Sequence, residues 1–198
     1  YLTENPFIKI KAPKTPKSLP LYIDDIGLQK ILASTPRQFL KDIFTIAFYS
    51  GLRLSEILNL KWTWIDFQKN NIITKISSDY STKSKRERII PIHKNILSIL
   101  NRIKYDTTLS KIYIFSDSEG KKYNENFISK QFKKALRKAG LDDNLHMHNL
   151  RHSFCSNLVQ KGVSLYVVKE LAGHQQLSTT EIYSHLTHAN LSNAVAVL

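Results

Sequence analysis

The stretch "HNLRH", residues 148–152, places His148, Arg151 and His152 within five positions. His148 and His152 are four residues apart, so on a helix they would share one face, which is the spacing of many zinc-binding histidine pairs. Zinc hydrolases of that type also need a glutamate beside the first histidine and a third ligand, whereas here Asn149 follows His148. A guanidinium within one turn of a dication is also electrostatically unfavourable. The residues therefore argue against a metal site.

An arginine and a histidine held side by side suit a phosphodiester instead. Its two non-bridging oxygens become more negative in a pentacoordinate transition state, and a guanidinium can bind both of them in a fork. His148 and Arg151 are three residues apart and would share a helix face. The pattern indicates phosphoryl transfer without a metal, which also needs a second cation, a nucleophile and a proton donor for the leaving oxygen.

Residues of those kinds stand elsewhere in the chain. They are Arg53 in "GLRLSEIL", with Glu56 one turn later; Lys83, Lys85, Arg86 and Arg88 in "STKSKRER"; His174 in "LAGH"; and Tyr183, nine residues after that histidine. Each one alone also has a purely structural interpretation, as a surface arginine, a solvated turn or a half-buried aromatic ring.

The composition favours an anionic partner. Twenty-nine Lys and Arg against sixteen Asp and Glu give a net charge of +13, which makes nucleic acid the first candidate and an anionic membrane surface the second. No apolar run approaches the roughly 20 residues that span a bilayer, so we expect no membrane insertion. Cys155 is the only cysteine, which excludes an internal disulfide and fits a reducing cytoplasm.

The periodicity of apolar residues predicts the elements that would position these side chains. Helices are expected within 24–34, 35–51, 54–60, 93–103, 124–140, 148–162 and 164–173, and strands within 62–67, 71–76 and 86–92. Thr35 is expected to cap the second helix and Gly51 to end it. Leu150, Phe154 and Leu158 are expected to form the buried stripe of the "HNLRH" helix. The predicted class is α+β, mainly helical, with a small three-stranded antiparallel sheet.

Residues 1–20 differ in character from the rest. Four prolines and an excess of lysine over acidic residues predict an extended basic linker. Residues 21–198 are expected to form one domain.

In this order and spelling, the motifs resemble the catalytic domain of the tyrosine recombinase (phage integrase) family over about residues 20–190. The motifs are G-L-R-x-x-E-I, a hairpin lysine before a hydrophobic residue and Pro, H-x-L-R-H, L-x-G-H, and a tyrosine nine residues later. The resemblance implies the fold of DNA breaking-rejoining enzymes. It also implies site-specific recombination or integration through a covalent 3′-phosphotyrosine, with no metal or cofactor. An N-terminal core-binding domain, usual in the family, is expected to be absent from this chain.

The resemblance also implies a role for each matching residue. Tyr183 would be the nucleophile, and Arg53 and Arg151 would bind the non-bridging oxygens. His148 would accept the tyrosine proton, His174 would donate a hydrogen bond to the phosphate, and Lys83 would protonate the leaving 5′ oxygen. Glu56 would support this network, and His152 would be structural. The lysine departs from the family pattern, because Thr82 and Ser84 replace the glycines that commonly flank it, and Lys85 is close enough to compete.

The expected partner is double-stranded DNA. Phosphate contacts are expected from a basic helix stripe that contains no acid and from the hairpin: Lys130, Lys133, Lys134, Arg137 and Lys138, with Lys85 and Arg86. A tetrameric synapse on DNA is expected, with residues 186–198 a candidate for contact between protomers, in the cytoplasm of a bacterial, archaeal or phage-infected cell. A type IB topoisomerase and a catalytically silent DNA-binding protein of the same fold remain as alternatives.

Overall fold

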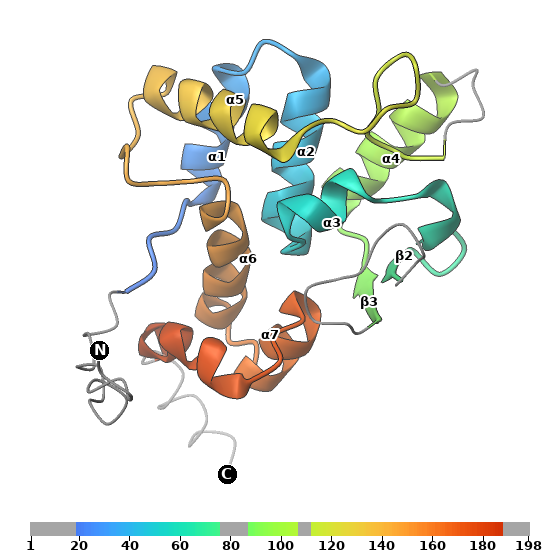
Figure 1. Cartoon of the computed structure of the whole chain (residues 1–198). Helices are drawn as coiled ribbons and strands as arrows, with labels where there is room; N and C mark the ends of the chain where they lie inside the picture. Colours follow the sequence, from blue (N-terminus) through green and yellow to red (C-terminus); the bar gives the residue numbers. More distant parts are fainter. Residues whose placement is uncertain (1–18, 76–86, 107–111, 188–198) are drawn as a thin grey trace, which may run out of the picture.

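A computed structural model describes residues 19–75, 87–106 and 112–187 of the chain. Its elements are, in order, α1 (Asp25–Ala33), α2 (Gln38–Ser50), α3 (Leu54–Leu58), the 3-10 turn η1 (Trp62–Trp64), β1 (Ile65–Asp66), β2 (Asn71–Thr74), β3 (Arg88–Pro91), α4 (Lys94–Asp106), α5 (Glu125–Lys138), α6 (Asn149–Gln160), α7 (Leu165–Ala172), η2 (Leu177–Thr179) and η3 (Glu181–Thr187). The expected class, mainly helical with one small antiparallel sheet, is confirmed (Figure 1). Of the described helices, none combines the length and the apolar character needed to cross a bilayer.

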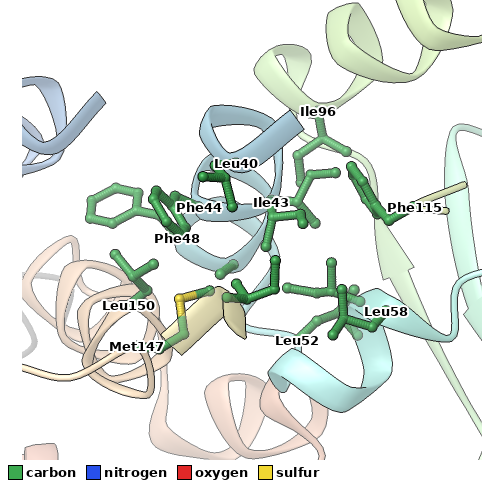
Figure 2. Packing of buried hydrophobic residues seen from close by; sticks show 14 of the residues in the cluster. Leu40, Ile43, Phe44, Phe48, Leu52, Leu58, Ile96, Phe115, Met147 and Leu150 are labelled. Carbon is green, nitrogen blue, oxygen red and sulfur yellow. The ribbon is translucent and has the colours of Figure 1, made fainter. Parts of the chain in front are cut away.

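Helix α2 is the centre of the larger apolar core. It is buried on nearly all sides because α1, α3, α4, α5 and α6 all pack against it. Phe44 of α2 meets Phe132 of α5 edge to face, with ring centroids 5.2 Å apart. Figure 2 shows Leu150 and Ile96 on opposite sides of α2. This helix therefore fixes the relative positions of the elements that carry the candidate site.

The sheet has the order β1-β2-β3, with antiparallel pairs throughout. Ile72 pairs with both Ile65 and Ile90, and these three side chains are buried, whereas Ile89 is 60% exposed. Successive strand residues point to opposite faces, so Arg88 lies on the same inward face as Ile90. One sequence prediction is wrong here: η1, expected within the first strand, is a 3-10 turn in which the Trp64 amide donates to the Lys61 carbonyl at 3.0 Å.

Helix α6 joins the main core to a smaller apolar cluster. That second cluster is built from Cys155, Val159, Val168, Ala172 and Tyr183, and in Figure 1 α7 and the following turns lie at one end of α6.

The predicted stripe on α6 is therefore only partly right. Leu150 is fully buried, but Phe154 and Leu158 are half-buried, and the fully buried side chains include Arg151 and Cys155. Because both clusters cover this helix, the stripe of apolar residues does not identify the buried face.

The start of α2 also differs from the prediction. Thr35 does not cap this helix, since its hydroxyl donates to the Ile31 carbonyl at 2.7 Å and so completes the end of α1. Helix α2 begins at Gln38 after Arg37, which makes no side-chain cap. Orphan carbonyls at a helix end need donors, and the carbonyl of Ile31 lies within reach of a hydroxyl four residues later.

Gly51 ends α2 as predicted and allows close packing at the site. Its φ is +64°, in the left-handed region that favours glycine. A Cβ at this position would stand 2.4 Å from Cδ1 of Phe154. The carbonyl of Gly51 also accepts a hydrogen bond from Nη1 of Arg151 at 2.6 Å.

We predict that Gly51→Ala destabilises the fold more than Gly140→Ala does. Both glycines have a left-handed φ, +64° and +67°, so both substitutions carry a backbone penalty of about 1–2 kcal/mol. A Cβ at Gly140 meets nothing within 4 Å, whereas at Gly51 the Phe154 ring must move, which adds about 1–3 kcal/mol. Urea denaturation of the two variants measures the difference, and equal losses would contradict it.

Candidate functional site

Arg53 and Glu56 are placed by the start of α3. Arg53 is the residue before the first turn, and its backbone N–H donates to Oε2 of Glu56 at 2.8 Å while its Nη1 donates to Oε1 at 3.0 Å. Glu56 is 1% exposed. The two residues expected to act together are thus joined by the helix-capping geometry itself.

Arg88 completes the environment of Glu56, although from the sequence it was only one of the hairpin charges. Its Nη1 and Nη2 donate to the two carboxylate oxygens at 3.0 and 2.7 Å, and its Nε donates to the Leu171 carbonyl at 3.2 Å. Burial raises the pKa of Glu56, but hydrogen bonds and charge from Arg88 and Arg53 bring it below its ordinary value. The available sequence signal was the strand alternation, which places Arg88 inward with Ile90.

Arg151 is almost completely buried, at 3% exposure. Nη1 donates to Gly51, but Nη2 is buried and has no hydrogen-bond partner among the described residues. Burial, and next the charge of Arg53, lower the pKa of Arg151 to about 10, so it remains a cation at neutral pH. A buried donor without a partner is costly, and an anionic oxygen would satisfy it.

Arg53 and Arg151 border one cavity of about 500 Å³. Its other lining residues are His148, His174, Gln175, Gln176 and Thr179. A second hollow of about 320 Å³ shares three of these residues, Arg53, His148 and Arg151, and reaches Glu125 and Ser129 at the start of α5. The structure therefore brings four of the six predicted catalytic residues to one place from three separate elements.

His174 is held by a residue that the sequence did not single out. Its Nδ1 lies 2.8 Å from the hydroxyl of Thr180, which is fully buried. Burial, followed by the charges of Arg151 and Arg53, lowers the pKa of His174 to about 3, so the ring is neutral at pH 7. When Thr180 donates to Nδ1, the ring proton is on Nε2, the tautomer that can donate to a ligand.

Tyr183 lies beside the cavity residues but is not among those that line the cavity. It is 1% exposed in the second apolar cluster, to which Cys155 also belongs, and its hydroxyl lies 2.6 Å from Nδ1 of His152. Burial and the neighbouring Cys155 raise the pKa of Tyr183. The His152 ring in turn meets the His148 ring at right angles, with centroids 4.9 Å apart. His152 thus stands between Tyr183 and the cavity residue His148.

The remaining predicted residues fall into two groups. Lys83, Lys85 and Arg86 lie outside the described residues.

The basic stripe lies on α5, where Lys130, Lys134, Arg137 and Lys138 are exposed. It is less uniformly cationic than expected, because Asp143, in the loop after α5, pairs with Arg137 at 2.8 Å and with Lys133 at 3.4 Å. An acid 10 residues beyond Lys133 is invisible to a helix-face argument.

His148 and His152, which have a zinc-like spacing, do not belong to a larger set of metal-ligating side chains in the described ranges. There, no three His, Cys, Asp or Glu side chains gather closely enough to hold a metal ion. Nδ1 of His152 is instead engaged with Tyr183.

Comparisons with known proteins agree with this geometry. The family model described as "Phage integrase family" matches residues 28–190. A tyrosine recombinase of Thermosipho africanus is 30% identical, covering 98% of this chain and 68% of that protein. Tyrosine recombinase XerA of Pyrococcus horikoshii is 33% identical, covering 94% and 64%. The chain thus spans about two thirds of the length of these relatives.

Solved structures show the same fold. The Tn1549 transposon integrase in complex with transposon right end DNA matches with a TM-score of 0.77 at 19% identity, over 100% of this chain and 72% of that one. The XerH site-specific recombinase bound to palindromic difH substrate matches with a TM-score of 0.72 at 25% identity, over 91% and 54%.

We predict that His174→Gln makes stability less sensitive to acid. The pKa of His174 is about 3 in the folded state and about 6.5 in an unfolded chain. Between these values the unfolded chain binds a proton that the folded one does not, so the free energy of unfolding falls as the pH falls from 6.5 towards 3.

A fully buried group would change the free energy of unfolding by about 1.4 kcal/mol per pH unit. The His174 ring borders an open cavity, so the slopes of the parent and the variant should differ by less than this. Urea denaturation of both proteins at about pH 7, 6 and 5 measures the slopes. Equal slopes would contradict the low pKa.

Proposed function

The chain belongs to the phage integrase family of tyrosine recombinases, and we propose that its cavity binds a scissile phosphate of double-stranded DNA that Tyr183 attacks. The observation that carries the proposal is the convergence of Arg53 and Arg151 on one cavity, with Nη2 of Arg151 buried and without a hydrogen-bond partner in the described part of the chain. Two guanidiniums and a neutral histidine form a site for an anion with several oxygens.

The proposed reaction is a strand cleavage followed by religation. The Tyr183 oxygen forms a bond to phosphorus, the bond to the 5′ oxygen breaks, and a 3′-phosphotyrosine and a 5′ hydroxyl result. His148 accepts the tyrosine proton, and Lys83 supplies a proton to the departing oxygen. A 5′ hydroxyl then attacks the phosphotyrosine, which reseals a strand and regenerates the tyrosine. Bond energy is kept in the covalent intermediate, so we propose that no cofactor is needed.

Arg53 and Arg151 stabilise the charge that develops on the non-bridging oxygens. Arg151 is fixed by Gly51 at 2.6 Å and by burial, and Arg53 by Glu56 at 3.0 Å. Groups held in this way need no reorganisation as the charge grows, which is the main source of electrostatic catalysis. His174, held by Thr180, donates a further hydrogen bond.

Tyr183 must leave its buried position before it can react. Its hydroxyl is bonded to His152 at 2.6 Å, and burial disfavours its ionisation. We propose that DNA binding shifts η3 so that Tyr183 enters the cavity beside His148. The path is short, because His152, the present neighbour of Tyr183, already contacts His148. The described arrangement is then a resting state.

The proposed partners are DNA and further copies of the protein. The net charge of +13 and the exposed lysines of α5 support phosphate contacts, and the hairpin cations Lys85 and Arg86 would add to them. We propose that the full protein recombines specific sites as a tetramer in the cytoplasm, with residues 186–198 contacting a neighbouring protomer. Residues 1–20 would link the domain 21–198 to a DNA-binding domain such as family members carry.

We predict that Tyr183→Phe abolishes covalent DNA attachment while DNA binding persists. The substrate is a duplex from the DNA flanking the gene, nicked near the cleavage point so that the short fragment with the new 5′ hydroxyl diffuses away and the adduct accumulates. Denaturing gel electrophoresis measures the adduct, and gel shift measures binding.

Two results would contradict the proposed function: no adduct with the full-length parent, or as much adduct with the variant. The first, with binding retained, would favour a silent DNA-binding protein. Relaxation of supercoiled DNA without site preference would favour a type IB topoisomerase. Loss of activity on adding a chelator would contradict metal independence.

We also predict that Thr180→Val lowers the cleavage rate about 10-fold, because one hydrogen bond to His174 is lost, whereas Thr180→Ser retains most of the rate. The rate of adduct formation at saturating protein measures this. Equal rates for the two variants would show that the hydroxyl does not act on His174.

A further inference from the structure

Arg88 uses every nitrogen of its guanidinium inside the protein. Its side chain is 9% exposed, Nη1 and Nη2 hold the two oxygens of Glu56, and Nε holds the Leu171 carbonyl. It therefore joins β3 to α3 and to the last turn of α7. None of these donors is directed to a ligand.

Arg88 also determines how Glu56 shares its charge. Glu56 lies between two guanidiniums, and Arg88 binds both of its oxygens, whereas the Arg53 side chain binds one of them, at 3.0 Å. Without Arg88, the buried carboxylate would have Arg53 as its one cationic partner among the described residues. A buried charge left with one partner binds it more strongly, so Arg53 would be drawn away from the cavity that it lines.

The same guanidinium supports the turn that carries His174. Gly173 ends α7 with φ +70°, and a Cβ there would stand 2.7 Å from Nη1 of Arg88. The glycine of the "LAGH" motif is thus required by two constraints, the left-handed backbone and the contact with Arg88. His174 follows directly and faces the cavity.

We propose that Arg88 is a positioning residue for DNA cleavage: by holding Glu56 and the end of α7, it keeps Arg53 and His174 directed at the phosphate. This role rests on the proposed function. It predicts that loss of Arg88 harms the chemical step through Glu56 and not through DNA affinity.

The test measures the adduct rate at saturating protein for Arg88→Met, Glu56→Gln and the double variant. Arg88→Met should cleave about 10- to 100-fold more slowly, the loss expected for one charge-assisted interaction, with DNA affinity changed by less than about 3-fold. The double variant should recover at least about 10-fold of the rate, because a neutral amide no longer competes for Arg53. A purely structural role gives no such recovery.

Arg102→Met is the matched control. Arg102 also pairs with a buried carboxylate, Asp42, at 2.6 Å, but neither residue lines the cavity. It should lower the melting temperature and leave the cleavage rate unchanged. Arg88→Lys keeps the charge but cannot bind both carboxylate oxygens of Glu56 and the Leu171 carbonyl. This variant should fold and still cleave more slowly than the parent. It therefore tests the role of Arg88 if Arg88→Met does not fold.

The outcomes separate the two proposals. If the parent forms no adduct, the proposed function and the role of Arg88 both fail. If the parent cleaves and Arg88→Met and Arg88→Lys both cleave as fast as the parent, only the role of Arg88 fails. It also fails if Glu56→Gln brings no recovery to a folded Arg88→Met protein.

Discussion

The site depends on the ion pairs of one buried carboxylate, that of Glu56, with Arg53 and Arg88. Burying a lone carboxylate costs several kcal/mol, and here four donors from Arg53 and Arg88 offset that cost. The pKa of Glu56 is lowered despite burial, so it stays ionised. Because its partners come from the start of α3 and from β3, and Arg88 extends to α7, one anion sets the relative positions of three elements around the cavity.

Among the described residues, those that line the cavity include two arginines and no carboxylate. Burial and then the charge of Arg53 lower the pKa of Arg151 to about 10, and burial and then the charges of Arg151 and Arg53 lower the pKa of His174 to about 3. Without an anion, the repulsion among these charges lowers the stability of the fold, and the apolar core around α2 offsets this loss. The affinity proposed for a phosphate and the local instability would thus have the same physical origin.

Tyr183 lies in the second apolar cluster and not among the residues that line the cavity. Its buried ring contributes to the stability of the fold in this position, and the attack on a phosphate that is proposed for it requires a different position. His152 links the two positions, since it contacts both Tyr183 and His148. The stretch "HNLRH" of this chain therefore carries one histidine at the cavity, His148, and one that is hydrogen-bonded to the tyrosine, His152.

The amino-acid sequence predicted the seven helices α1–α7, the three strands, the end of α2 at Gly51 and four residues that line the cavity, Arg53, His148, Arg151 and His174. It could do so because capping, periodicity and motif spacing act within a few residues along the chain. It did not determine which face of α6 is buried, the pairing of Asp143 with the α5 stripe, or the place of Tyr183. Nor did it reveal the partners of Arg88, since Glu56 and Leu171 lie 32 and 83 residues away. Those contacts form only when the core brings distant segments together, so they follow from the packing of the whole domain and not from local sequence patterns.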